Sequence, residues 1–285
     1  MTMTRRDWLK ATAGLAGAGL VGAWPAQAAA ASRPVRIHIG SCMVSLDEAK
    51  QAGLEGVEIR AGNAAQRLEI ADPEVRQKYK EKMKQTGLVI SSVMMGLLNS
   101  NPLASDPRGP AWLEQTIDAA KDLGAKVILV AFFGKGNLLA DGKLKQADVD
   151  VVVERLKAAA PRAERSGVIL AIENTLSARH NAEILARIDH PAVRIYYDVG
   201  NSTNLGYDVP AEIRFLKDRI AQIHFKDNPH YLGEGKVAFP PIAAAIEEIG
   251  YQGWIVLETT SPSKDRIADA RRNAAYVRNL FRRPV

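Results

Sequence analysis

Short apolar runs recur along this chain, and each is separated from the next by a longer segment of mixed polarity. Most of the runs are rich in valine and isoleucine. Several are continuous rather than alternating, which is typical of parallel strands that are covered on both faces. The pattern predicts eight strands, at residues 35–41, 54–60, 88–96, 125–133, 168–174, 193–199, 219–225 and 254–260.

Helical spacing of apolar residues marks segments between these strands. The segment 73–87 follows Asp72, a typical helix cap, has proline in its first turn and ends at Gly87. Similar patterns predict helices at 110–124, 149–167, 240–250 and 266–281. All but the last of these end on glycine, which readily adopts the left-handed conformation that closes a helix.

Eight alternations of strand and helix over about 250 residues are the pattern and size of a (β/α)8 TIM barrel. We therefore expect one α/β barrel domain over residues 34–282. An open, doubly wound sheet is the competing fold. It is less consistent with the sequence, because no G-x-G-x-x-G motif follows the first strand.

The first 28 residues do not belong to the predicted barrel. Arg5 and Arg6 precede an apolar stretch of about 14 residues, which is shorter than the roughly 20 residues of a membrane-spanning helix, and the small residues AQA follow at 26–28. Residues 1–28 are therefore predicted to be an export signal of the twin-arginine type, which carries proteins across already folded. An ordinary secretory signal or an uncleaved anchor is the alternative. The expected location is the periplasm, and the expected partner is the twin-arginine export machinery.

Charge and cysteine content narrow the function. Without residues 1–28 the net charge falls from +6 to about +4, and no run of five to eight basic residues occurs, so nucleic acid is not an expected partner. No other segment has the length of a membrane span, and we expect no stable membrane anchor.

Cys42 is the only cysteine, which excludes an internal disulfide. We interpret it as a packing residue rather than a nucleophile. The sequence leaves the oligomeric state open, a homo-oligomer included.

Four candidate metal ligands fall at the ends of the last four predicted strands, the end at which TIM barrels carry their active sites. They are separated by 25, 26 and 34 residues, and each gap is one strand–helix unit; the four are Glu173, Asp198, His224 and Glu258. Three carboxylates and an imidazole suit Mn²⁺, Mg²⁺, Co²⁺ or Zn²⁺, and the oxygen-rich set favours the harder ions. The alternative is that each of the four residues only pairs with a lysine or arginine at the barrel rim. That alternative does not explain why the four stand at equivalent positions on consecutive strands.

Segments around these residues resemble the sugar phosphate isomerase/epimerase family of xylose isomerase-like TIM barrels. The resemblance spans essentially residues 34–282 and is carried by AIEN (171–174), YYDVGN (196–201), IHFKDN (223–228), LGEGKVAF (232–239) and VLETT (256–260). It implies that the four candidate ligands bind one divalent metal ion, commonly manganese. It also implies that Glu173 and Glu258 form the acid/base pair, while Asp198 and His224 only bind metal.

That arrangement suits proton transfer next to a carbonyl. A divalent cation stabilises the enediolate that forms when the proton leaves, one carboxylate takes the proton, and a second carboxyl returns one. Return to the same carbon inverts its configuration, whereas return to the neighbouring carbon moves the carbonyl group.

The predicted substrate contacts differ from those of the family's ketose 3-epimerases. Asn201 stands where those enzymes have histidine, His230 stands where they have arginine, and ENTLSAR (173–179) has no additional glutamate. His230 is expected to be either a substrate contact or a solvated loop histidine. Lys226 points to the same side of its strand as His224, so it is predicted either to contact substrate or to form a salt bridge with Asp227 or another rim acid.

The remaining candidates are less specific. Phe133 or its neighbour Phe132 offers a flat surface for a sugar ring, although at least one of the two is expected in the core. Asp227 is expected to be a turn or salt-bridge residue. Glu58 is expected to pair with a basic neighbour such as Arg60.

The sequence therefore predicts a metal-dependent sugar isomerase or epimerase that acts on an extracytoplasmic sugar, keto-sugar or glycoside. Elimination from a 3-keto-glycoside by a lyase or dehydratase is the main alternative, and a non-catalytic sugar-binding protein is the alternative of another class. An apurinic-site endonuclease shares the barrel, but it needs several more histidines than the five of this chain and a basic surface for DNA.

Overall fold

The computed structural model describes residues 36–281, and the predicted export signal lies outside them. Eight parallel strands close into a barrel in the order β1-β10-β9-β8-β7-β4-β3-β2. Their bounds are β1 (Ile37–Ser41), β2 (Gly56–Arg60), β3 (Val89–Met95), β4 (Val127–Phe132), β7 (Ile169–Asn174), β8 (Val193–Asp198), β9 (Ile220–Phe225) and β10 (Gly253–Leu257). Each matches a predicted strand, which confirms the TIM-barrel fold.

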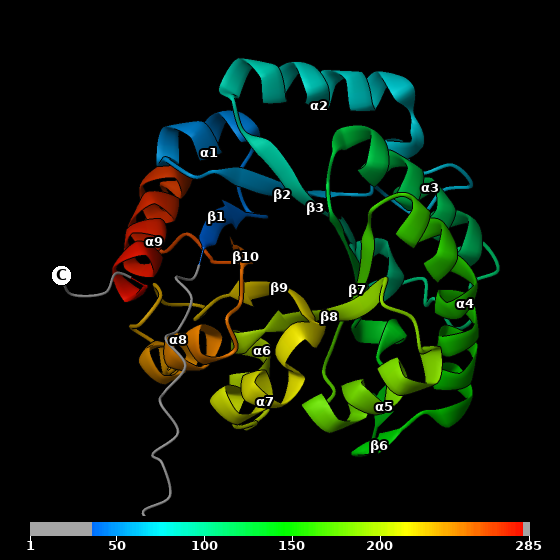
Figure 1. Ribbon diagram of the computed structural model, residues 1–285. Helices are drawn as coiled ribbons and strands as arrows, with labels where there is room; N and C mark the ends of the chain where they lie inside the picture. Colours follow the sequence, from blue (N-terminus) through cyan, green and yellow to red (C-terminus); the bar gives the residue numbers. More distant parts are fainter. Residues whose placement is uncertain (1–35, 282–285) are drawn as a thin grey trace, which may run out of the picture. The chain divides into compact units, whose positions relative to one another are not determined.

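Helices surround the strands on the outside of the barrel (Figure 1). The five predicted helices are observed as α2 (Pro73–Thr86), α3 (Gly109–Leu123), α4 (Gln146–Arg165), α8 (Phe239–Glu248) and α9 (Arg266–Leu280). The periodicity did not indicate four shorter helices, α1 (Leu46–Ala52), α5 (Ala178–Ile188), α6 (Val199–Asn204) and α7 (Val209–Leu216). Capping marks the starts of these helices: Ser45 and Glu48 form a capping box at α1, for example.

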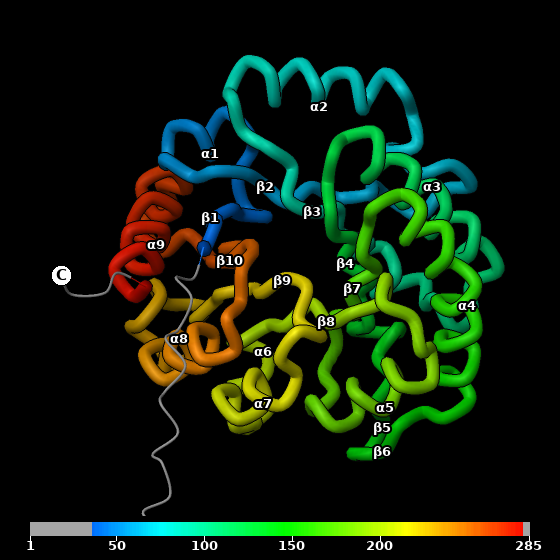
Figure 2. Tube along the Cα trace, in the orientation of Figure 1, coloured from blue at the N-terminus to red at the C-terminus, as the bar shows by residue number. Residues whose placement is uncertain are grey.

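The first and last strands pair with each other and close the barrel. β1 and β10 run in parallel from Ile37 opposite Gly253 to Ser41 opposite Leu257. The Cα trace shows α9, at the end of the chain, beside α1 (Figure 2). Closure brings the C-terminal ends of β7 to β10 onto one face, where the predicted site lies.

Two further features complete the fold. A two-stranded hairpin, β5 (Leu139–Ala140) with β6 (Lys143–Leu144), lies between β4 and α4 and was not predicted. No helix within residues 36–281 combines the length and apolar character needed to cross a bilayer.

Candidate metal centre

The structure brings the four predicted ligands together. Each of Glu173, Asp198, His224 and Glu258 places one donor atom within 4.8 Å of those of the others. Asp198 is the last residue of β8, Glu173 and His224 are the penultimate residues of β7 and β9, and Glu258 immediately follows β10 rather than ending it. Glu173, Asp198 and His224 are buried, whereas the Glu258 side chain is 30% exposed and faces the mouth of the site.

Asp198 divides its two oxygens between the fold and the site. It is the N-cap of α6, and its Oδ1 accepts the Asn201 backbone N–H at 2.7 Å. Its Oδ2 is buried and lacks a well-formed hydrogen bond, although Lys226 Nζ lies 2.8 Å away. Because a buried carboxylate oxygen without a hydrogen bond is costly, this atom is suited to a cation.

Lys226 lies inside the site rather than at its rim. Its Nζ is 2.8 Å from Asp198 Oδ2 and 2.6 Å from Glu258 Oε2, so the observed salt bridges are with these two acids and not with Asp227. Burial would lower the pKa of Lys226, but the two carboxylates outweigh burial and hold that pKa above its usual range.

The carboxyl groups differ in their electrostatic surroundings. Burial raises the pKa of Glu173 to about 7 and also raises the pKa of Asp198. Burial acts on Glu258 in the same direction, but His224 and Lys226 overcome it and lower the pKa of Glu258 below its usual value. Burial would likewise lower the pKa of His224, yet the surrounding acidic groups raise it.

These donors fit one divalent metal ion. Three carboxylates and the imidazole Nδ1 converge, and one buried carboxylate oxygen has no hydrogen bond. Oxygen and imidazole donors of this kind suit Mn²⁺, Mg²⁺, Co²⁺ or Zn²⁺.

A buried polar network lies on the other side of His224, inside the barrel. Glu58 on β2 is 3% exposed, and it accepts hydrogen bonds from the hydroxyl groups of Ser92 and Tyr196 at 2.7 and 2.9 Å. Its other oxygen lies 3.2 Å from His224 Nε2. The predicted pairing of Glu58 with Arg60 is therefore wrong, because the partners of the buried Glu58 are Ser92, Tyr196 and His224, while Arg60 is exposed.

Sequence reasoning missed Ser92, Tyr196 and Gln222 in this network. Gln222 Nε2 donates to Ser92 Oγ at 2.7 Å and to the Tyr196 hydroxyl at 2.9 Å. A signal was present, since Gln222 is a polar residue in an apolar strand and lies two positions before His224, on the same face.

Cys42, which follows β1, lies near His224 only through the fold. Its Sγ is 3.7 Å from the Leu257 carbonyl oxygen, and burial raises the pKa of its thiol to about 11. This disfavours the thiolate and agrees with the interpretation of Cys42 as a packing residue. Its Sγ, a Glu58 oxygen and a His224 nitrogen also lie within 4.8 Å of one another.

The other predicted residues lie at different depths. Phe132 is in the core, whereas Phe133 is half-buried and packs against an apolar cluster that includes Ala171 and Tyr196. His230 is exposed. Asp227 is a turn residue, as predicted, and accepts the backbone N–H groups of Gly233, Gly235 and Val237.

A hollow of about 400 Å³ adjoins the metal centre at the ends of β8 and β9. It includes the predicted contacts Lys226 and His230, and its lining is Gly200, Asn204, Lys226, Asp227, Asn228, Pro229, His230, Lys236 and Val237. Three basic side chains line it. Its one acid, Asp227, is buried and occupied by backbone N–H groups, so the hollow favours polar or anionic groups.

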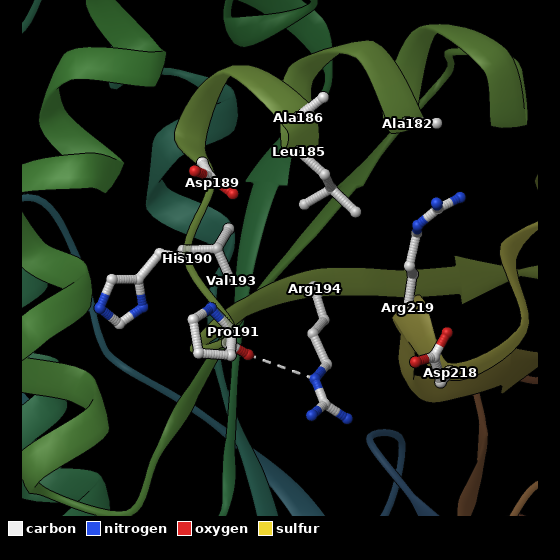
Figure 3. A pocket seen from close by; sticks show the side chains of 10 residues that line it. All are labelled: Ala182, Leu185, Ala186, Asp189, His190, Pro191, Val193, Arg194, Asp218 and Arg219. Atoms are coloured by element: carbon white, nitrogen blue, oxygen red, sulfur yellow. Dashed lines mark hydrogen bonds between the residues drawn. The ribbon is translucent and has the colours of Figure 1, made fainter.

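A second hollow of about 430 Å³ lies at the opposite end of the strands (Figure 3). Asp189, His190 and Arg194 surround it near the start of β8, and Arg194 Nε donates to the Pro191 carbonyl at 3.3 Å. Because it opens where β8 and β9 begin, it is separate from the candidate metal centre.

Residues 46–280 match the family described as xylose isomerase-like TIM barrel. The chain belongs to this family. Its membership agrees with the closed barrel and with the resemblance carried by the strand ends.

Relatives of known name are sugar epimerases. The chain is 29% identical over 249 residues to the putative L-ribulose-5-phosphate 3-epimerase SgbU of Escherichia coli strain K12, covering 78% of this chain and 85% of SgbU. It is 26% identical over 248 residues to the L-ribulose-5-phosphate 3-epimerase UlaE of E. coli O157:H7 strain EC4115, covering 79% and 85% of the two chains.

Solved structures share the fold. The E. coli 3-keto-D-glucoside 4-epimerase YcjR superposes with a TM-score of 0.71 at 18% identity, covering 86% of this chain and 99% of YcjR. An L-ribulose 3-epimerase gives a TM-score of 0.72 at 20% identity, covering 87% and 94%.

Proposed function

We propose that this protein is a divalent-metal-dependent sugar isomerase or epimerase that moves a proton next to a carbonyl group. The observation that carries the proposal is the convergence of Glu173, Asp198, His224 and Glu258 at one end of the barrel. The family and the sugar epimerases among its relatives support the same reaction class.

All four residues would hold the ion, with Mn²⁺ the expected metal. When bound, the ion would supply electrophilic stabilisation of negative charge on the substrate's carbonyl oxygen. Lys226, already between two of these carboxylates, adds a fixed positive charge at the same place.

Glu173 and Glu258 are the proposed acid/base pair. One carboxylate takes the proton as the C–H bond breaks, and the bonding electrons move toward the carbonyl oxygen. The other carboxyl group gives a proton to carbon, and the carbonyl group re-forms. The Glu258 side chain is 30% exposed and that of Glu173 is 6% exposed, so a sugar that enters from solvent meets Glu258 first.

The substrate is proposed to enter the hollow of about 400 Å³ beside the site, which has room for a monosaccharide. Lys226 and His230 line this hollow and would contact the sugar. Asn201 and Phe133 are the other proposed contacts. Asn201 follows Gly200 of the lining, and its N–H donates to Asp198, whereas Phe133 follows β4. We propose an extracytoplasmic sugar or keto-sugar as the substrate, in keeping with the export signal predicted in residues 1–28.

Solvent exchange tests the reaction. The Mn²⁺-loaded protein is incubated in deuterated water with free ketoses, ketopentose 5-phosphates and 3-keto-glycosides. Deuterium is expected on the carbon next to the carbonyl group, together with an epimer or isomer. Glu258→Gln should abolish turnover to the epimer or isomer, because its amide can neither accept nor give the proton.

The possible products separate the alternatives. Loss of the group beside the ketone would identify a lyase. Sugar binding with neither exchange nor product would contradict catalysis and identify a binding protein. Turnover at the wild-type rate in Glu258→Gln would contradict the role of Glu258.

A further inference from the structure

His224 is held between two carboxylates on opposite edges of its ring. Its Nδ1 lies 3.0 Å from Glu173 Oε1, on the side of the metal centre, and its Nε2 lies 3.2 Å from Glu58 Oε1, on the barrel side. The imidazole is completely buried. Only one ring nitrogen therefore faces the candidate metal centre, and the other faces Glu58.

Glu58 has no lysine or arginine partner within residues 36–281; its charged neighbour is His224. A buried carboxylate needs hydrogen-bond donors, and Glu58 has three: the hydroxyl groups of Ser92 and Tyr196, and His224 Nε2. A metal-binding histidine generally directs its other N–H at such an acceptor, which fixes the tautomer and the orientation of the ring.

The hydrogen-bond directions in the network can be derived by counting protons. Each hydroxyl has a single proton, and both protons are used on Glu58. Ser92 and Tyr196 must therefore accept from Gln222, whose Nε2 lies 2.7 and 2.9 Å from their oxygens. The chain of donors runs from Gln222 through the two hydroxyls to Glu58, and His224 donates to Glu58 from the other side.

We propose that Glu58 is a positioning residue for the metal centre: it holds the proton of His224 on Nε2 and turns the Nδ1 lone pair toward Glu173, Asp198 and Glu258. Tyr196 supports the ring as well, since its own ring lies 4.4 Å from that of His224, centroid to centroid. When Nδ1 is deprotonated to bind a metal, the Nε2 proton stays because Glu58 accepts it. The inference rests on the proposed metal-dependent function.

Two variants and a matched control test the role. Glu58→Gln keeps the shape of the side chain but removes its charge, and Glu58→Leu removes every acceptor. Glu55→Gln is the control, because Glu55 is an exposed acid that precedes β2 and pairs with His38 outside the site. Mn²⁺ affinity is measured by electron paramagnetic resonance. The protonation of His224 is read from ¹⁵N NMR of the Mg²⁺-loaded protein.

We expect wild type and Glu55→Gln to bind one Mn²⁺ with equal affinity and to show a proton on Nε2. Glu58→Gln should bind Mn²⁺ about 10–100-fold more weakly. The ¹⁵N signals of His224 should move toward a mixture of the two tautomers, and more so in Glu58→Leu. A purely structural role would not change these signals in a folded protein. If Glu58→Leu fails to fold, Glu58→Gln carries the test.

Unchanged affinity and unchanged ¹⁵N signals in Glu58→Gln would overturn the inference and leave the proposed function intact. Weakened binding in Glu58→Gln, alongside a wild type inactive on every sugar, would support the inference while the proposed function fails. Two ions per wild-type chain, falling to one in both Glu58→Gln and Cys42→Ser, would also overturn it, because Glu58 would then be a ligand of a second ion held with Cys42.

Discussion

At the scale of single residues, the candidate metal centre contains more buried acidic side chains than basic ones. Glu173, Asp198 and Glu258 face His224 and Lys226, and burial raises the pKa of the two most enclosed carboxyl groups. Without a divalent ion, protons must offset part of the negative charge. The stability of the metal-free protein should therefore depend on pH in a direction set by these groups.

We expect the metal-free protein to lose stability as pH rises from about 4.5 to about 7. The pKa of Glu173 is about 7 in the folded protein, against 4.5 as its ordinary value. Between these values the unfolded chain releases the proton while the folded chain still holds it, so stability that is complete below pH 4.5 is lost by about pH 7. The raised pKa values of Asp198 and His224 act in the same direction, whereas the lowered pKa of Glu258 changes stability only below about pH 4.5.

Thermal unfolding in a chelator, followed from about pH 4.5 to 8, measures this effect. Glu173→Gln should unfold a few degrees above wild type at about pH 8, since 1 kcal/mol corresponds to about 2–4 °C in a domain of this size. Glu258→Gln is the matched control. The pKa of the Glu258 carboxyl group is lowered, so this group stabilises the wild-type protein above about pH 4.5. The Glu258→Gln variant should therefore unfold at a lower temperature than wild type. Shifts of the same sign in both variants would contradict the assignment.

Lys226 gives a second prediction, because its ammonium group occupies the space between two proposed ligands. Lys226→Met should bind Mn²⁺ at least as tightly as wild type, since the ion no longer competes with Nζ for Asp198 and Glu258. Turnover should fall on the order of 10²-fold, because a fixed positive charge beside the developing negative charge is lost. Titration calorimetry and steady-state kinetics measure the two effects.

Lys157→Met serves as the control for Lys226→Met, since Lys157 is exposed on the outer helix α4. Weaker Mn²⁺ binding in Lys226→Met, with turnover preserved, would show that Lys226 supports the ligands rather than the reaction.

The sequence revealed the donors of the site but not their supports. The four ligands could be found because each ends or nearly ends an apolar strand, at intervals of one strand–helix unit. Glu58 could not be assigned in the same way, because its partners Ser92, Tyr196 and His224 are 34, 138 and 166 residues away. Ser92 lies opposite Glu58 on the neighbouring strand β3, but only barrel closure brings Tyr196 and His224 to it, and the nearby Arg60 suggested a local partner that the structure excludes.

At the scale of elements, the loop after β9 is organised by one side chain. Asp227 is 5% exposed, and it accepts backbone N–H groups from Gly233, Gly235 and Val237 at 2.8–3.1 Å. The N–H groups of Gly233 and Gly235 therefore point at Asp227, whereas the N–H of Glu234 donates to the Tyr231 carbonyl. This loop carries His230 and follows Lys226 directly, so its order bears on the proposed substrate hollow.

Replacement of Asp227 should loosen this loop. Asp227→Asn keeps one acceptor oxygen and should lower the free energy of unfolding by about 1–3 kcal/mol, as expected when charged hydrogen bonds are lost. Gly235→Ala should act similarly, because an added Cβ would lie 2.2 Å from Asp227 Oδ1. Urea unfolding measures the loss, and the exposed Asp218→Asn is the control. Stability equal to wild type in both loop variants would contradict the role of Asp227.

Helices and strands could be predicted from the sequence where their apolar residues follow one clear pattern over enough positions. Strand positions came from continuous Val- and Ile-rich runs, and the long helices from 3.6-residue spacing between a cap and a glycine. The helix α6 has only six residues, from Val199 to Asn204, too few for a periodic signal. It forms because Asp198 caps it, so one side chain serves both as N-cap and as proposed ligand.

At the scale of the whole molecule, the proposed metal centre depends on barrel closure. Its donors come from β7, β8, β9 and the residue after β10, spread over residues 173–258. None of these segments could assemble the site alone, so a metal ion can be bound only once the barrel has folded. An exported protein that needs such an ion benefits from crossing the membrane folded, with the metal loaded beforehand.

This reasoning gives the last prediction, which concerns residues 1–28. Replacement of Arg5 and Arg6 by lysine should block export, because the twin-arginine route reads that pair. The folded barrel should then accumulate inside the cell with its signal attached. Cell fractionation and N-terminal sequencing measure this, and the exported wild-type protein is expected to begin after Ala28. Lys10→Gln is the control, since it lowers the charge of the segment but keeps the arginine pair. Export of the double lysine variant at the wild-type level would indicate an ordinary secretory signal, and the chain would then have to fold and acquire its metal after crossing the membrane.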